Sequence, residues 1–117
     1  MATVLYGIKN CDTVKAARRW LDDADIDYQF HDFRQNGLSS SKLNSWMNLL
    51  GSKVLINRRS TSWKNLTDSQ RAAIDRGEGS LTILENPTLI KRPVLEHGGQ
   101  VQCGFAVDHY QSIFAEK

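Results

Sequence analysis

The chain has 117 residues, and 15 basic against 13 acidic side chains give it a formal net charge of +2. Its length suits one domain with one modest core, and an apolar share of 40% excludes disordered and collagen-like chains. So small a charge, without a concentrated basic stripe, gives no reason to expect nucleic acid or a membrane surface as a partner.

The first third of the chain predicts a β-α-β unit. Residues 3–6 form a short apolar strand, and residues 7–10 form the loop that leaves it. From Asp12, apolar side chains recur at helical spacing as far as Ala24. From Ile26 to His31 apolar and polar residues alternate, as in a half-buried strand. The two strands should be parallel, with a right-handed crossover.

The middle of the chain is predicted to be helical. Serines at positions 39–41 can cap a helix that Gly51 ends. Thr67 and Gln70 have the spacing of a capping box, and the helix that follows should stop at Gly77. A further short helix is therefore expected after this stop.

The last third of the chain predicts a short helix, which is the last of the helical region, then a hairpin and a final helix. Ser80 can cap the first of these helices. Strands at residues 94–96 and 101–103 flank Gly98-Gly99, a two-residue turn signal, and should therefore be antiparallel. Asp108 can cap the final helix.

The order of elements is therefore β-α-β, a helical insertion, then β-β-α. One mixed sheet covered by helices is the economical packing of these pieces. This is the layout of a thioredoxin-like α/β fold with an inserted helical subdomain at about residues 38–86. We expect residues 1–117 to form a single domain.

The sequence lacks the features of exported and membrane-spanning proteins. No apolar run approaches the roughly 20 residues that cross a bilayer, and the N-terminal residues have no basic region ahead of their apolar stretch. Cys11 and Cys103 are far apart and fit no zinc-binding spacing. We therefore expect a cytoplasmic monomer without a metal site.

Cys11 is the sharpest candidate for chemistry. It stands where a strand and its loop lead into a helix, so the unpaired N–H groups of the first helical turn favour a thiolate there. Lys9 adds positive potential, whereas Asp12 opposes it unless its carboxylate caps the helix. The alternative is a buried structural cysteine, but the polar neighbours of Cys11 favour reactivity. Cys103 is expected to be a core residue on an inner strand.

Three arginines are candidates for binding an anion. Arg58 and Arg59 follow an apolar run, and Arg92 directly precedes Pro93 at the start of a predicted strand. Guanidinium groups grip carboxylates and oxyanions and keep their charge. The alternative for each arginine is a solvated surface charge. A cis bond before Pro93 would turn the preceding carbonyl towards the Cys11 side, where an extended peptide such as glutathione could pair with it.

Several blocks of the chain resemble the ArsC/Spx/YffB family of arsenate reductase-like proteins, and most closely its YffB-type branch. The resemblance covers nearly the whole chain, in family order. It lies in YGIKNCDT at residues 6–13, NRRSTSWKNL at 57–66, NPTLIKRP at 86–93, and again near Gly104-Phe105.

The resemblance implies site residues as well as the thioredoxin-like fold. Cys11 is implied as the nucleophile, with Arg92 facing it from a cis Arg-Pro turn. The family's other arginine matches Arg59 best, although an offset by one to Arg58 stays open. Lys9, Asn10, Arg58 and Pro93 are then expected to contact the substrate.

The resemblance implies a glutathione-dependent thiol oxidoreductase with one active-site thiolate. Glutathione would be a co-substrate, no cofactor would stay bound, and glutaredoxin is a candidate partner. One alternative is a glutaredoxin-coupled arsenate reductase, but Gly104-Phe105 stand where such enzymes carry a third arginine. The other is a non-catalytic Spx-like adaptor, yet Val14 occupies the position of the second cysteine of the Spx C-x-x-C motif.

Overall fold

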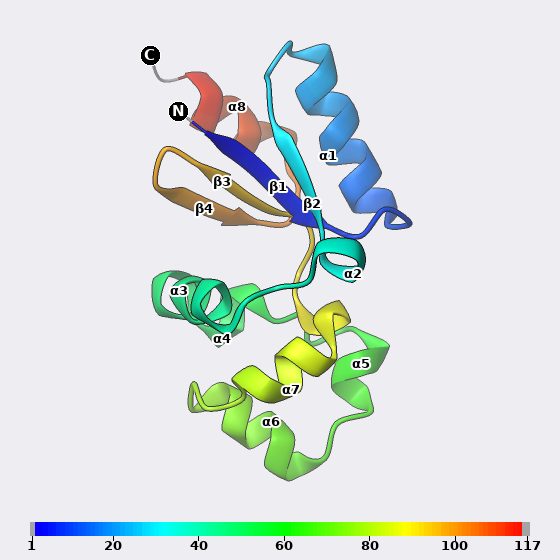
Figure 1. The fold of residues 1–117 in the computed structure, drawn as a ribbon, viewed down its shortest axis with the longest axis vertical. Coiled ribbons are helices and arrows are strands. Elements are labelled where there is room, and N and C mark those ends of the chain that lie inside the picture. The colour runs from blue at the N-terminus through cyan, green and yellow to red at the C-terminus, as the bar shows by residue number, and fades with distance from the viewer. Residues whose placement is uncertain (1, 116–117) are drawn as a thin grey trace. The chain divides into compact units, whose positions relative to one another are not determined.

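A computed structural model of the protein describes residues 2–115, which fall into two compact units (Figure 1). The first unit combines the chain up to Asn36 with the chain from Arg92 onward. The second unit, Gly37–Lys91, is helical and covers the range of the expected insertion. That the whole chain acts as a single domain stays a prediction.

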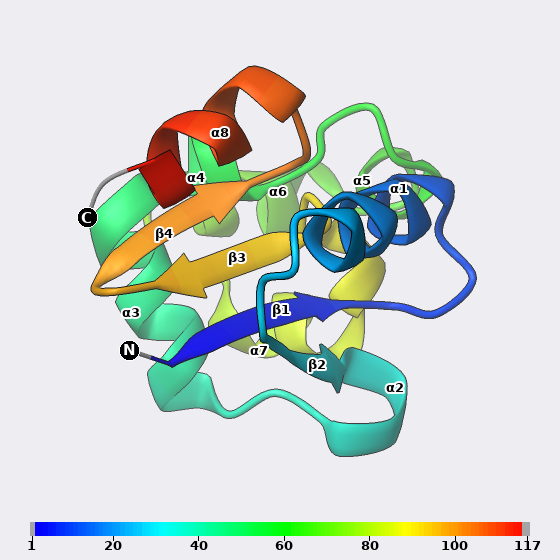
Figure 2. The same cartoon turned by 90° about the horizontal axis from the view of Figure 1, so that it is seen from above.

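The first unit is built on a four-stranded mixed sheet with the strand order β2-β1-β3-β4 (Figure 2). The pair β1–β2 is parallel and the pair β3–β4 is antiparallel, as predicted, and β1 pairs with β3 in antiparallel orientation. The strands are β1 (Thr3–Gly7), β2 (Gln29–Asp32), β3 (Val94–His97) and β4 (Gln100–Cys103). The helices of this unit are α1 (Asp12–Asp23), α2 (Phe33–Asn36) and α8 (Val107–Ala115).

One face of this sheet carries the core of the unit. Leu5 and Leu95 lie directly opposite each other on β1 and β3, so their side chains share a face. Ala17 and Leu21 of α1 and Tyr110 of α8 complete a fully buried cluster with them. The helices α1 and α8 therefore cover the same face of the sheet. The helical periodicity predicted the burial of α1 correctly, except at Ala24, which is exposed.

The second strand begins later than its alternating pattern predicts. Ile26 still donates its N–H to the carbonyl of Leu21 at 3.0 Å, and Asp25 has a φ of 56°, so the chain is still leaving α1 at this point. Pairing starts only at Gln29, opposite Val4. The residues before Gln29 contribute side chains to the core without joining the ladder.

Two other expectations about this unit were wrong. Asp108 lies inside the first turn of α8 and does not cap it, because the helix already begins at Val107. Cys103 ends β4, which is an edge strand and not an inner one, and its side chain is half-buried. The Gly98-Gly99 hairpin is confirmed, with positive φ at both glycines, as a two-residue turn of this kind requires.

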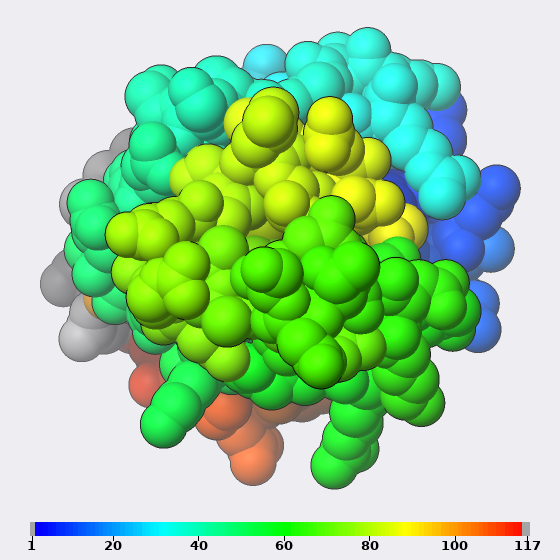
Figure 3. Space-filling view, turned by 90° about the horizontal axis from the view of Figure 1, so that it is seen from below, coloured from blue at the N-terminus to red at the C-terminus, as the bar shows by residue number. Residues whose placement is uncertain are grey.

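The second unit is a set of short helices, and Figure 3 shows the face formed by its green to yellow segments. The helices are α3 (Ser40–Leu50), α4 (Ser52–Leu55), α5 (Thr61–Lys64), α6 (Asp68–Asp75) and α7 (Ser80–Glu85), followed by a 3-10 turn at Pro87–Leu89. The capping box of Thr67 and Gln70 is present at the start of α6. Gly79, and not Ser80, is the N-cap of α7, because the Ser80 hydroxyl donates to the side-chain oxygen of Asn44 instead.

Replacing Tyr110 by phenylalanine should raise the free energy of unfolding by about 1 kcal/mol, the scale of the penalty for an unpaired buried hydroxyl. Tyr110 is fully buried, and its hydroxyl has no hydrogen-bond partner among residues 2–115. Burial, and to a lesser extent Cys103, raises the pKa of Tyr110, so the phenol stays neutral. The ring itself packs edge-on against Trp20 and Phe105 and would be kept. Urea unfolding checks this expectation, and a loss of stability would contradict it.

Candidate active site

The segments that carry the first unit's predicted site residues meet at one end of the strands of the sheet. Tyr6 near the end of β1 pairs with Val94 at the start of β3. The chain therefore leaves β1 towards Cys11 at the same end of the sheet at which it enters β3 through Arg92 and Pro93 (Figure 2). The register thus brings the cysteine loop and the Arg-Pro segment together at this end of the strands.

Cys11 stands at the start of α1, as the strand-loop-helix pattern predicted, and it is the N-cap residue of this helix. Its backbone is extended, with φ −119° and ψ 123°, and its carbonyl accepts the N–H of Lys15 at 2.9 Å. The side chain makes no capping hydrogen bond, and the thiol is free and half-buried. The sulfur at this helix end is therefore left available for other chemistry, next to the unpaired N–H groups of the first turn.

Gly7 lets α1 approach the end of β1. A Cβ atom at this position would lie 2.7 Å from Cγ2 of Val14, a fully buried residue of α1. Real Cβ contacts are essentially never so short, so a larger residue would push the helix away. The absence of a side chain at Gly7 therefore helps to set where the helix start and its cysteine lie.

Asp32 is a site residue that the sequence analysis missed. It pairs with Gly7 at the end of β2, and it is only 4% exposed. Its carboxylate accepts the N–H of Lys9 at 3.3 Å and those of Arg34 and Gln35 at 2.8 and 3.3 Å. It thus caps α2 and fastens the loop before the cysteine. The available signal was an aspartate directly before a helical turn, where its carboxylate can accept the N–H groups two and three residues further on.

The Arg92-Pro93 bond is cis, as the family resemblance implies. Pro93 is buried, and its carbonyl accepts the N–H of Gly104 at 2.8 Å, which ties the start of β3 to the end of β4. Arg92 is half-buried, and its guanidinium forms no ion pair with any residue of the described range 2–115. It is therefore available to an anionic ligand.

Lys9 and Asn10 are exposed in the loop before Cys11 and lie in the first unit with it. Arg58 and Arg59 belong to the second unit, so their approach to Cys11 stays a prediction. The two arginines differ in their surroundings. Arg58 pairs with Asp75 at 2.6 Å and covers the ring of Trp63 at 4.8 Å, whereas Arg59 is exposed and forms no ion pair within residues 2–115.

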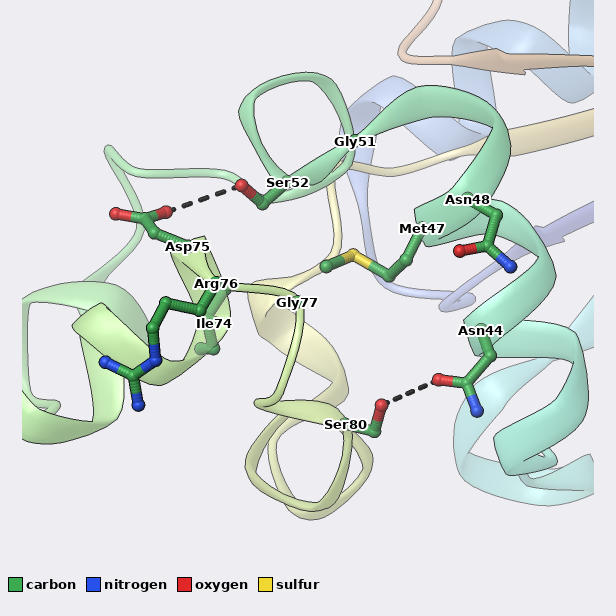
Figure 4. Close-up of a pocket in the computed structure, with 10 residues that line it drawn as sticks. All are labelled: Asn44, Met47, Asn48, Gly51, Ser52, Ile74, Asp75, Arg76, Gly77 and Ser80. Carbon is green, nitrogen blue, oxygen red and sulfur yellow. Dashed lines mark hydrogen bonds between the residues drawn. The ribbon is translucent and has the colours of Figure 1, made fainter.

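A cavity of about 570 Å³ in the second unit is lined by no cysteine and by one carboxylate, that of Asp75 (Figure 4). Its lining is made mostly of amide, hydroxyl and backbone groups. Ser80 donates to Asn44 across it at 2.7 Å. Asp75 accepts hydrogen bonds from Arg58 and Ser52, and chiefly the Arg58 bond lowers the pKa of this carboxyl. With its carboxylate engaged in this way, the cavity has no free acid or base for catalysis.

Among residues 2–115, no group of three or more His, Cys, Asp and Glu side chains could hold a metal ion. No helix in this range has both the length and the apolar character needed to cross a membrane.

Comparison with known proteins identifies the family. The model of the ArsC family matches residues 6–113. An uncharacterised protein of Haemophilus influenzae is 44% identical over 98% of this chain and 100% of its own length.

Two solved structures agree with this assignment. A protein named YFFB superposes with a TM-score of 0.89 at 40% identity, over 96% of this chain and 98% of its own. An arsenate reductase (ArsC) related protein from Brucella melitensis gives a TM-score of 0.76 at 38% identity, over 97% and 95%. The chain therefore belongs to the ArsC family of arsenate reductase-like proteins and has their thioredoxin-like fold.

Proposed function

We propose that this arsenate reductase-like protein is a glutathione-dependent thiol oxidoreductase that works through Cys11 alone. The observation that carries the proposal is the free, half-buried thiol at the N-terminus of α1. It lies at the end of the sheet where the chain enters β3 through Arg92 and cis-Pro93. Helix N-termini and nearby cations favour the thiolate, which is the reactive form in disulfide exchange.

The cycle needs one protein thiol and one free glutathione molecule for each mixed disulfide. The Cys11 thiolate attacks the glutathione sulfur of a mixed disulfide, the S–S bond breaks, and the substrate leaves as a thiolate that takes a proton from water. A glutathione thiolate then attacks the Cys11–glutathione disulfide. Oxidised glutathione is released, and the Cys11 thiolate is restored. The substrate is thereby released as a thiol, and one free glutathione leaves joined to the glutathione of the mixed disulfide as oxidised glutathione.

The other site residues would bind the peptide and its charges. Arg92, which has no ion pair in the described range, would hold a carboxylate near the sulfur, while backbone groups around Pro93 pair with the extended peptide. Arg59 would hold a second carboxylate, and the engagement of Arg58 by Asp75 supports Arg59 in this role. Lys9 and Asn10 would contact the peptide from the cysteine loop.

Exposure to oxidised glutathione should place one glutathionyl adduct on Cys11, found by peptide mass spectrometry. Cys103→Ser should keep this adduct, and Cys11→Ser should lose it. The Cys103→Ser control is needed because Cys103 pairs with Val94, which in turn pairs with Tyr6 near the end of β1. Both cysteines therefore belong to the same end of the sheet. An internal Cys11–Cys103 disulfide, or an adduct on Cys103 alone, would overturn the single-thiol cycle.

Arsenate reduction is the second candidate, and the likeness to the Brucella ArsC-related protein favours it. In that reaction Cys11 would attack arsenate, and glutathione with glutaredoxin would complete the cycle. Turnover of arsenate with glutathione and glutaredoxin separates the two functions. Phe105 follows β4 where the resemblance expects a third arginine, so we expect slow or no turnover.

A further inference from the structure

The second unit contains a smaller cavity with a strongly basic wall. Its volume is about 390 Å³, at the lower end of the range of small-molecule sites. Four of its six lining residues are cationic and none is acidic; the six are Lys53, Ile56, Asn57, Arg58, Arg59 and Lys91. The small net charge of the whole chain conceals this local concentration of positive charge.

Backbone pairing brings these residues together from two distant segments. Ile56 and Ile90 form an antiparallel bridge, and both are buried. On either side of this bridge, Lys91 donates its N–H to Leu55 at 2.7 Å, and Asn57 donates its N–H to Leu89 at 2.8 Å. Lys91 is therefore held beside the segment that carries the two arginines.

A tight turn orients the arginine segment. The side-chain oxygen of Asn57 accepts the N–H of Arg59 at 3.1 Å, and its carbonyl accepts the N–H of Ser60 at 3.2 Å. The Asn57 side chain is thus used to shape the turn. Arg58 and Arg59 follow as neighbours within this turn and line the same cavity.

Three of the four cations of this cavity have no carboxylate partner among the described residues 2–115. Arg58 has Asp75 as its counterion, at 2.6 Å. Lys53 influences Asp75 only at longer range, and Lys53, Arg59 and Lys91 form no ion pair with a carboxylate among residues 2–115. One carboxylate therefore stands against four cations. Like charges gathered around one cavity repel one another, and a multiply charged anion would remove that cost.

We propose that this cavity binds a small oxyanion carrying two negative charges, either a phosphate group or a pair of carboxylates. Guanidinium forks suit planar or tetrahedral oxyanions, and two ammonium groups add point charges, Lys53 from α4 of the arginine segment and Lys91 from the segment paired with it. The site shares Arg59 with the proposed function, adds Lys53, Arg58 and Lys91, and does not depend on Cys11.

Titration of the full-length, ¹⁵N-labelled protein with inorganic phosphate and with succinate, at constant ionic strength set with chloride, tests this site. The amide signals of residues 53, 57–59 and 91 should move and saturate with at least one of these anions. Saturation with phosphate alone assigns a phosphate group, saturation with succinate alone assigns paired carboxylates, and saturation with both assigns a general oxyanion site. No saturable shift with either anion would overturn the proposal.

Matched variants separate binding in the cavity from general charge effects. Lys53→Gln and Lys91→Gln should each weaken binding about three- to fivefold, the scale of one exposed charge pair. Lys64→Gln removes an exposed lysine of the same unit outside the cavity and should leave binding unchanged. Equal weakening by all three variants would overturn the site. Cys11→Ser should bind phosphate or succinate like the wild type, so that failure of the thiol chemistry and failure of this site are distinguishable.

Discussion

Cys11→Ser should lower the rate of glutathione mixed-disulfide reduction by at least about a thousandfold, because a serine hydroxyl stays protonated near neutrality and forms no disulfide. The substitution preserves the local structure. The Cys11 side chain makes no capping hydrogen bond, and the bond from Lys15 goes to the backbone carbonyl. Serine is itself a favoured N-cap residue, so the variant should be at least as stable as the wild type.

The measurement is the steady-state reduction of a mixed disulfide of glutathione and 2-mercaptoethanol, followed through NADPH consumption by glutathione reductase. Cys103→Ser is the matched control, since it removes the chain's other thiol. It should keep the rate within about twofold, as expected of a residue outside the reaction. Activity in Cys11→Ser above a tenth of the wild-type rate would contradict the assignment, as would loss of activity in Cys103→Ser alone.

Features fixed by a few neighbouring residues were predictable from the sequence. The capping box of Thr67 and Gln70 and the turn at Gly98-Gly99 each contain their own partners within three residues, and both are confirmed. Prediction was wrong where a distant residue competes. The hydroxyl of Ser80 is used by Asn44, 36 residues away, so it does not cap its own helix.

The residues of the candidate site likewise divide into those that neighbouring sequence places and those that a distant segment places. Cys11 could be placed at a helix start from its own strand, loop and helix. Asp32 could not be placed, because only the register of β2 against β1 brings its carboxylate to the N–H of Lys9. Lys91 likewise reaches the basic cavity only through the bridge between Ile56 and Ile90. Local patterns do not encode such contacts.

Gly79→Ala should lower the free energy of unfolding by about 3 kcal/mol, at the upper end of the usual cost of overpacking. A Cβ atom at Gly79 would lie 2.3 Å from Cγ1 and 2.8 Å from Cα of Ile74. Ile74 is fully buried in α6, and one of the two atoms belongs to the backbone, so the clash cannot be relieved by turning a side chain. The φ of Gly79 is −97°, which alanine adopts freely, so the loss would be steric.

Gly77→Ala is the matched control two residues away in the same turn. Gly77 has a φ of 80° with nothing within 4 Å of an added Cβ, so alanine there should cost only about 1 kcal/mol, from the left-handed backbone. Urea unfolding followed by tryptophan fluorescence reports on this unit, because it contains Trp46 and Trp63. If Gly77→Ala proved the more damaging variant, backbone conformation and not the contact with Ile74 would govern this turn. The expected order therefore separates steric exclusion from dihedral strain within one connection between α6 and α7.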